Sequence, residues 1–252
     1  MDVRRALTTI ADDPDVKTKI KVGVFVVSAP FISIAAVGYQ VQMARQVVAG
    51  VEAPLPDWDD LGRLFRQGFG LALAGLIYEI PARLLLLATL LLALRPLWLA
   101  SEAAQPLAAG PAWQSLQILA MGLKLGLLYN LAYGFLAPAI MAQFVRHGTL
   151  RACLNLGGLW RFIVRQPRAY MKVWAVRELA GLVARLAGMG LGMVVGVLPL
   201  VGPLASTVTW GWLLFVSRLL NGSLVGQLLR LEDGRPLYQP ASAPALIPAP
   251  EA

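Results

Sequence analysis

The chain has 252 residues, of which 58% are hydrophobic and only 14% are charged, and its mean hydropathy is +0.65. A soluble globular domain is about 45–50% apolar and about 25% charged, so this composition predicts an integral membrane protein. One cysteine, Cys153, and one histidine, His147, exclude a disulfide framework and a clustered Cys/His metal site. The net charge of +8 does not indicate nucleic-acid binding, because most basic residues flank apolar segments, where membrane topology accounts for them.

Residues 1–21 mix basic and acidic side chains, so we expect a retained cytoplasmic segment and no cleavable signal peptide. A membrane span needs about 20 apolar residues. By that measure four of the five apolar stretches qualify as spans, and the first, which has Pro30 at its centre, is marginal. The five stretches are 22–39, 68–94, 113–144, 171–200 and 203–229.

The distribution of Lys and Arg between the stretches predicts the topology. The 145–169 loop carries five arginines and no acidic residue, whereas the 95–112 loop carries only Arg95. If all five stretches crossed from an inside N-terminus, the arginine-rich loop would face outward, against the positive-inside rule. A re-entrant hairpin that turns at Pro30 instead places every basic loop inside.

We therefore expect an all-α integral membrane protein of the cell (inner) membrane, with four transmembrane helices, one Pro-broken re-entrant hairpin and both termini cytoplasmic. The hairpin must pack on the bundle, because non-helical backbone at that depth is tolerated only against protein or a wet cavity. The predicted organisation is a cytoplasmic segment over 1–21, a helical membrane domain over 22–230 and a Pro/Ala-rich disordered tail over 231–252.

Two inside segments have the pattern of amphipathic surface helices. In 57–69, Trp58, Leu61, Phe65 and Phe69 share one helical face, and Asp57 is the expected N-cap. In 150–168 one face carries Cys153, Leu156, Trp160 and Ile163, and the other carries Arg151, Asn155, Arg161, Arg165 and Arg168. This pattern is typical of a helix in the headgroup plane over anionic lipid, and the alternative is a connector packed on the bundle.

Glycines recur every fourth residue in the apolar stretches. The run from Gly188 to Gly196 lacks the spacing of a dinucleotide-binding fingerprint, and no strand-to-helix turn is expected there. Small residues one turn apart instead let helix backbones approach closely in lipid, so the pattern indicates a glycine zipper in a tight bundle or an oligomer seam. The glycines assigned to helix packing are Gly122, Gly126, Gly134, Gly188, Gly192 and Gly196.

Several ionisable residues fall inside the predicted spans. Such residues usually face the bundle interior and have a function, and an interior basic excess would suit an anionic solute or lipid. The alternative is that their long side chains snorkel to the interface. Glu79 and Arg83 stand four residues apart and can pair on one face. The candidate interior polar residues are Glu79, Arg83, Lys124, Arg185 and Arg218.

Few features of the sequence indicate an enzyme, and we expect no enzymatic activity and no cofactor. Ser206, Ser217 and Cys153 have no histidine nearby in the spans to act as a base, and His147 stands alone in a basic loop. The chain has neither a phosphate-binding loop motif nor a metal-ligand spacing.

Segment 38–81 contains a series of short motifs: Gly38-Tyr39, Arg45, Leu55-Pro56-Asp57-Trp58, Leu64-Phe65 with Gly68, and Tyr78 with Pro81. With these motifs the segment resembles the family catalogued as domain of unknown function 4013, a family of bacterial and archaeal membrane proteins. Gly226-Gln227 is also similar to the end of the family pattern. The resemblance implies a membrane location and carries no catalytic residues.

Two functional classes remain open. The favoured one is a non-enzymatic membrane scaffold or assembly protein whose inside-facing helices contact anionic lipid headgroups, with a second copy or another membrane protein as partner and no nucleic acid. The other is a small transporter or channel for an anionic solute or lipid that uses Lys124, Arg185 and Arg218. The absence of an internal repeat, which many transporters carry, favours the scaffold.

Overall fold

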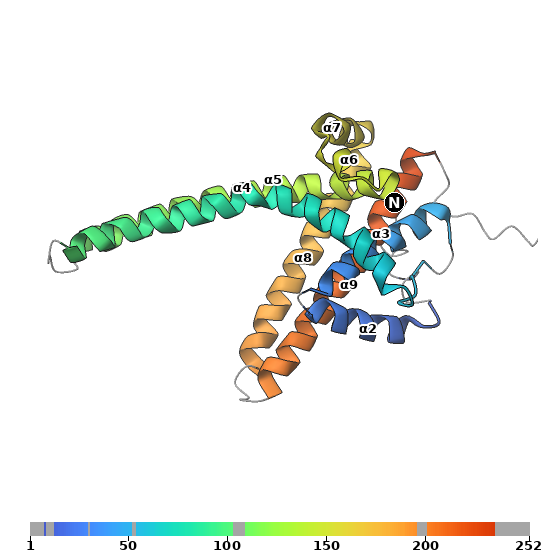
Figure 1. Ribbon diagram of the computed structural model, residues 1–252, viewed down its shortest axis with the longest axis horizontal. Coiled ribbons are helices and arrows are strands. Elements are labelled where there is room, and N and C mark those ends of the chain that lie inside the picture. The colour runs from blue at the N-terminus through green and yellow to red at the C-terminus, as the bar shows by residue number, and fades with distance from the viewer. Residues whose placement is uncertain are drawn as a thin grey trace, which may run out of the picture. The chain divides into compact units, whose positions relative to one another are not determined.

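The computed structural model describes residues 8, 13–29, 31–51, 54–102, 109–195 and 201–234, and within these ranges every regular element is helical. The all-α prediction is confirmed for these residues (Figure 1). Pro30, Gly196, most of residues 1–12 and the predicted disordered tail beyond 234 lie outside them. The helices are α2 (Val16–Ser28), α3 (Ser33–Ala49), α4 (Leu61–Glu102), α5 (Ala109–His147), α6 (Leu150–Leu154), α7 (Leu156–Arg165), α8 (Pro167–Val195) and α9 (Val201–Glu232).

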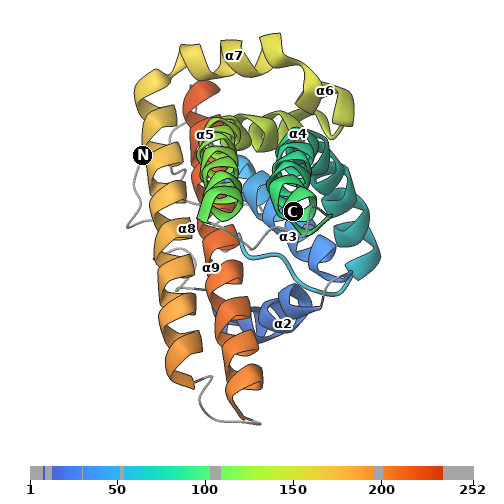
Figure 2. The same ribbon diagram turned by 90° about the vertical axis from the view of Figure 1, so that its left-hand side faces the viewer.

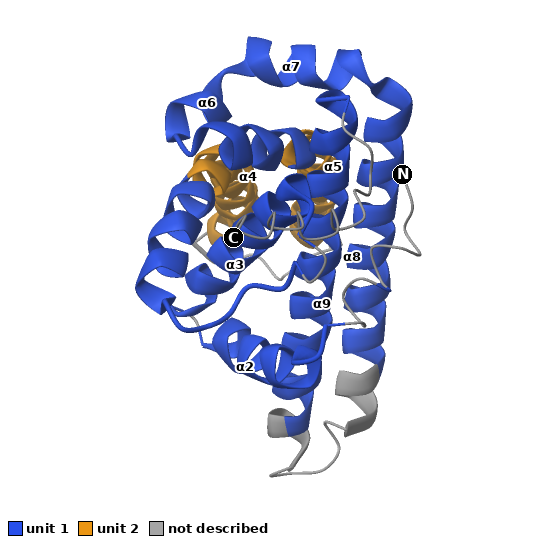
Figure 3. Cartoon of the chain, turned by 90° about the vertical axis from the view of Figure 1, so that its right-hand side faces the viewer, with its two compact units in different colours: residues 1–73, 138–252 blue, residues 74–137 orange. Residues whose placement is uncertain are grey.

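The chain divides into two compact units, which are described separately (Figure 3). Unit 1 comprises residues 1–73 and 138–252, and unit 2 comprises residues 74–137. Both α4 and α5 therefore contribute residues to both units.

In unit 1, α9 packs against α8, α3 and α2 (Figure 2). The core contains Tyr39 and Met43 of α3, Leu64 of α4, and Phe215 and Leu219 of α9. The side chains of Val26 and Val27 in α2 complete it on one side. Most of the helix surface that α9 presents is therefore covered by protein.

Unit 2 is an antiparallel hairpin of the C-terminal part of α4 and the N-terminal part of α5. The Tyr129 hydroxyl donates a hydrogen bond to the Tyr78 carbonyl, and the Tyr78 and Tyr133 rings stack with centroids 6.2 Å apart. Leucines are exposed on several faces of α4, among them Leu84, Leu86, Leu87 and Leu91. Leucine exposed on several sides of a helix is typical of a helix in a bilayer.

Three helices among the described residues are long and apolar enough to cross a membrane: Leu61–Pro96, Gly110–His147 and Ala205–Glu232. They coincide with the predicted spans 68–94, 113–144 and 203–229. The fourth predicted span, 171–200, is not among them, and its residues 196–200 lie outside the described ranges. The count of four spans therefore stays a prediction.

The first apolar stretch forms two helices, with α2 ending at Ser28 and α3 beginning at Ser33. The break lies where the sequence predicts a turn, whereas membrane re-entry at this point stays a prediction. At its other end α3 stops at Gly50, whose φ of 82° lies in the left-handed region. Its N–H caps the carbonyls of Gln46 and Val47.

The predicted surface helix over 57–69 is wrong in two respects. The helix begins at Leu61 and continues without interruption as α4, and the N-cap is Asp60, whose Oδ1 accepts a hydrogen bond from the Arg63 N–H at 2.8 Å. Trp58 precedes the helix, so it does not share the exposed face of Leu61, Phe65 and Phe69. The spacing of Trp58 from Leu61 and Phe65 matches a helical face only by coincidence, because the helix is capped at Asp60 and does not extend back to Trp58.

Candidate functional site: a motif core and a basic interfacial helix

The residues of the 38–68 motif converge in unit 1, where we call them the motif core: Gly38, Tyr39, Leu55, Trp58, Leu64 and Gly68. The Trp58 indole stacks on the Tyr39 ring with centroids 4.3 Å apart, and Phe215 of α9 completes the aromatic cluster 5.6 Å from Tyr39. Leu55 and Leu64 are buried beside them. The motif thus brings α3, the 54–60 segment, α4 and α9 together.

Two motif glycines let α3 and α4 cross in backbone contact. A Cβ on Gly38 would overlap the backbone carbonyl of Leu64, and a Cβ on Gly68 would overlap that of Ile34. Neither carbonyl can move without displacing its helix, so any larger residue would force the helices apart. Close backbone contact between helices, which the sequence predicted at other glycines, therefore occurs at Gly38 and Gly68.

An ionic cluster, in which Asp13 and Lys19 are largely buried and Asp57 is exposed, links α2 to the motif core. Lys19 Nζ lies 3.2 Å from Asp13 Oδ2 and 3.1 Å from Asp57 Oδ1, and it also donates to the Leu55 carbonyl at 2.9 Å. Burial lowers the pKa of the Lys19 ammonium, but its bonds to Asp57 and Asp13 outweigh this and the pKa is raised above its ordinary value. Trp58 Nε1 donates to the Lys19 carbonyl at 3.0 Å and closes the cluster. Asp57 therefore acts as an ion-pair partner and not as the predicted helix cap.

Two arginines cap the C-terminal ends of helices. Arg45 Nε donates to the Val145 carbonyl near the end of α5 at 3.3 Å, and burial lowers the pKa of its guanidinium. Arg230 Nη1 donates to the Val47 carbonyl near the end of α3 at 3.2 Å. The last carbonyls of a helix lack intrahelical partners and carry a partial negative charge, which explains why cations occur there.

Segment 150–168 forms two helices instead of one. Asn155 separates α6 from α7, and its side chain accepts from the Gly158 N–H at 3.0 Å, which caps α7. The cap shifts the buried face to Leu159, Phe162 and Ile163. Of the apolar face predicted from sequence, Cys153 and Ile163 are buried, whereas Leu156 and Trp160 are about 60% exposed.

Helix α7 consequently has three faces. Besides the buried face, an exposed apolar stripe runs along Leu156, Trp160 and Val164, four residues apart. Arg161 and Arg165 follow on the next face of the helix, and both are exposed. Apolar and basic stripes side by side on one helix are characteristic of a helix that lies in the membrane interface.

The four predicted headgroup-contact arginines differ in their surroundings. Arg165 Nη1 pairs with Glu232 Oε1 at 2.9 Å, and Arg146 pairs with Glu232 and Asp233 at 2.9 and 2.5 Å, which fastens the ends of α5, α7 and α9 together. Within the described residues Arg151 and Arg168 have no acidic partner, and Arg161 bonds only the Gly157 carbonyl one turn away. Arg165 is therefore the least available of the four for lipid.

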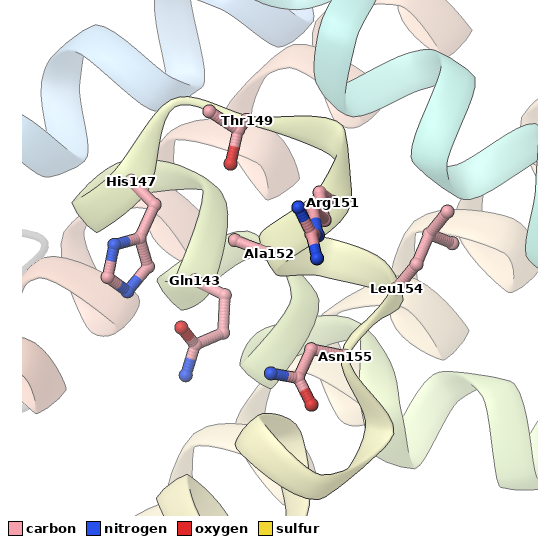
Figure 4. Close-up of a pocket in the computed structure, with 7 residues that line it drawn as sticks. All are labelled: Gln143, His147, Thr149, Arg151, Ala152, Leu154 and Asn155. Carbon is pink, nitrogen blue, oxygen red and sulfur yellow. The ribbon is translucent and has the colours of Figure 1, made fainter.

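An open cleft of about 700 Å³ adjoins α6 (Figure 4). Figure 4 shows Gln143, His147 and Asn155 around the same open space, with Thr149 and Arg151 beside them. The lining contains no acidic residue and offers amide, hydroxyl and guanidinium donors. Its chemistry suits an anionic group such as a phosphate.

The candidate interior residues lie as follows. In unit 2, Arg83 Nη2 and Glu79 Oε2 pair at 2.7 Å, as their spacing predicts, with both side chains partly exposed, and Lys124 is exposed. In unit 1, Arg185 is exposed on α8. Arg218 on α9 is half-buried and its Nη1 donates to the Ser33 carbonyl at 3.1 Å.

The predicted packing glycines behave unequally. A Cβ on Gly122 would overlap the Thr89 side chain and one on Gly188 would overlap Trp210, so both sit in close helix contacts. A Cβ on Gly126 would meet nothing within 4 Å among the described residues, so no neighbouring helix of the same chain packs there, and a role at an oligomer seam stays a prediction. Gly134 is buried on α5, whereas Gly196 and the surroundings of Gly192 lie outside the described residues, so the packing roles of these three glycines stay predictions.

The family model described as protein of unknown function, DUF4013, matches residues 22–193, which is more than half of the chain. The chain belongs to the DUF4013 family. The match covers the motif core up to Gly68 and both helices of the hairpin in unit 2. It ends before Gly226-Gln227, the position at which the sequence also resembles the family pattern. No curated protein and no solved structure matches this DUF4013 protein.

Sequence reasoning missed three residues of this DUF4013 protein that organise unit 1. Lys19 and Arg230 were counted only as topology-determining charges, yet both are largely buried and bond backbone carbonyls. Asn155 was placed on the polar face, although it ends one helix and caps the next. The run Asn-Leu-Gly-Gly at 155–158 was the available signal, because asparagine is a common N-cap residue and glycine weakens a helix interior.

Proposed function

We propose that this DUF4013 protein is a non-enzymatic scaffold of the cell (inner) membrane that binds the cytoplasmic leaflet through α6 and α7. The observation that carries the proposal is the arrangement on α7, where the exposed stripe of Leu156, Trp160 and Val164 adjoins basic residues. The apolar stripe enters the acyl boundary, and Arg161 contacts anionic headgroups together with Arg151 and Arg168. The cleft beside Arg151 accommodates the phosphate of one such headgroup.

The interlocked motif core supports a structural role. Its glycine crossing, its aromatic stack and the ionic cluster around Lys19 hold α2, α3, α4 and α9 at fixed positions, which is what a platform for a partner requires. A second copy of the chain or another membrane protein is the proposed partner. The proposed orientation has four crossings, a re-entrant α2–α3 hairpin and both termini in the cytoplasm.

The test compares paired with unpaired arginines. In nanodiscs, we expect Arg151→Gln/Arg161→Gln/Arg168→Gln to lower the enrichment of phosphatidylglycerol over phosphatidylcholine around the protein, by about 1 kcal/mol per residue near the surface. Arg165→Gln is the matched control, because its partner is Glu232: it should reduce thermal stability and leave lipid enrichment nearly unchanged. Equal lipid enrichment in the wild type and the triple variant would refute the leaflet contact.

A transporter is the second candidate, and Arg218 is the residue that favours it. Its guanidinium is half-buried in α9 and bonds a backbone carbonyl, so it could bind an anion from within unit 1. In reconstituted vesicles a transporter would conduct an anionic solute or lipid, and Arg218→Ala or Lys124→Ala would abolish that flux. If vesicles with the wild-type protein show no more flux of these solutes or lipids than protein-free vesicles, the scaffold is the better explanation.

A further inference from the structure

A groove of about 900 Å³ runs between α2 and the N-terminal half of α9, both in unit 1. Its walls are mostly apolar and include Ile20, Val24 and Phe25 of α2 and Val208 and Trp212 of α9. The volume is within the range of about 300–1,000 Å³ that is typical of sites for small molecules. Phe25 is 73% exposed and therefore leaves the groove accessible along its side.

The charge of the groove is concentrated at one end. Lys17 and Lys21 line it four residues apart on the exposed face of α2, and Ser28 lies at the opposite end. Ser28 lies eleven positions after Lys17, which corresponds to about 16 Å along a helix. Within the described residues neither lysine has an acidic partner, in contrast to Lys19, which points to Asp13 and Asp57.

The position of α2 along α9 places this groove beside a candidate membrane span. A Cβ on Gly211 would lie 2.6 Å from Ser28 Oγ and one on Gly23 would overlap Phe215, so α2 crosses α9 over residues 211–215. These residues lie inside the candidate span Ala205–Glu232 and not beyond its end. Charged side chains beside a span are tolerated where they face water, a partner charge or a lipid headgroup.

We infer that the α2–α9 groove is a binding site for one anionic phospholipid, whose acyl chain lies along Val24, Val208 and Trp212 and whose phosphate is held by Lys17 and Lys21. The long apolar wall with a doubly basic end is complementary to an amphiphile with a charged head. The site is distinct from the α6–α7 face, which lies at the other end of unit 1 (Figures 1 and 2). It does not depend on the scaffold proposal.

The first experiment measures lipid binding to the delipidated full-length protein in detergent by native mass spectrometry. We expect phosphatidylglycerol to bind more tightly than phosphatidylcholine with the same acyl chains, by roughly thirtyfold for two lysines near the headgroup. Lys17→Gln/Lys21→Gln should remove this preference and leave phosphatidylcholine binding unchanged. The matched control Lys172→Gln/Arg66→Gln removes two exposed basic residues elsewhere in unit 1 and should retain the preference.

A second variant tests the apolar wall. Val208→Trp fills the groove and should weaken binding of both phospholipids at least tenfold, with an unchanged melting temperature as the folding control. Inorganic phosphate should not compete in the millimolar range, because it lacks the acyl chain. Equal affinity of the wild type for the two lipids, or an equal loss in the control pair, would overturn the assignment.

Cross-linking identifies the occupant directly. A photoreactive benzophenone amino acid at Phe25, in cells and in nanodiscs, should yield an adduct with the mass of an anionic phospholipid. An adduct with residues 1–12 of the same chain, or with a second copy, would show that protein occupies the groove and would overturn the proposal.

Discussion

At the level of single residues, the Tyr39 side chain combines an aromatic contact with a buried hydroxyl. Its ring packs against both Trp58 and Phe215, whereas its hydroxyl is buried and has no hydrogen-bond partner among the described residues. A buried polar group without a hydrogen-bond partner destabilises the folded state, whereas an aromatic ring in a packed cluster stabilises it. The two parts of this side chain therefore act on stability in opposite directions.

This contrast predicts the effects of two substitutions. Tyr39→Phe should leave the free energy of unfolding unchanged or raise it by about 1 kcal/mol, because only the unpartnered hydroxyl is lost. Tyr39→Ala should cost about 3–5 kcal/mol through the cavity that it leaves. Thermal unfolding in detergent measures both, and a Tyr39→Phe variant as unstable as Tyr39→Ala would show that the hydroxyl has a partner.

Cys153 gives a second prediction at this level. Its thiol is fully buried, donates weakly to the carbonyls of Ile140 and Thr149, and has a pKa that burial raises to about 11. Only roughly a thousandth of the thiol is then ionised at pH 8, and the thiolate is the reactive form. We expect native protein to react with maleimide far more slowly than protein in SDS, with the rate rising tenfold per pH unit between pH 8 and 10. Equal rates in both states would contradict the buried position.

At the level of helices, contact between backbones depends on which glycines face a neighbour. Gly38 and Gly68 do so across the α3–α4 crossing, whereas Gly126 faces open space although it belongs to a regular GxxxG pattern. A spacing of four places residues on one face of a helix, but it does not determine whether another helix covers that face.

Two alanine substitutions separate these cases. Gly38→Ala should destabilise unit 1 by about 1–3 kcal/mol or more, because the Leu64 carbonyl has to move with its helix. Gly126→Ala should be neutral or stabilise its helix by up to about 1 kcal/mol. Melting temperatures of the two variants in the same detergent test this, and similar losses in both would indicate that Gly126 is covered in the membrane.

At the level of the whole molecule, the three candidate spans differ in how much protein covers them. The most apolar window of Leu61–Pro96 is 11% buried, that of Gly110–His147 is 33% buried and that of Ala205–Glu232 is 61% buried. Apolar surface that no protein covers must be covered by lipid or by another chain. The α4–α5 hairpin is therefore the part of the protein that most needs the bilayer, and α9 needs it least.

Single cysteines on a Cys153→Ser background test the proposed topology in intact cells or oriented vesicles. Asp59→Cys and Arg168→Cys are exposed positions and should react with a membrane-impermeant maleimide only from the cytoplasmic side. Gly110→Cys, at the tip of the α4–α5 hairpin, should react only from the opposite side. If Gly110 and Asp59 label from the same side, the hairpin does not cross the membrane.

Composition and local pattern by themselves determined the membrane-protein character, the helical class and the position of three candidate spans, because each of these depends on short stretches of consecutive residues. The 38–81 motif likewise placed the chain in its family. Tertiary structure decided which residues distant in sequence contact each other. Trp58 packs against Tyr39 and Phe215 in the core, and Arg165 forms an ion pair with Glu232. A close helix crossing occurs at Gly38 and not at Gly126. Periodicity assigns a residue to a face of its helix, and only the arrangement of helices determines what that face meets.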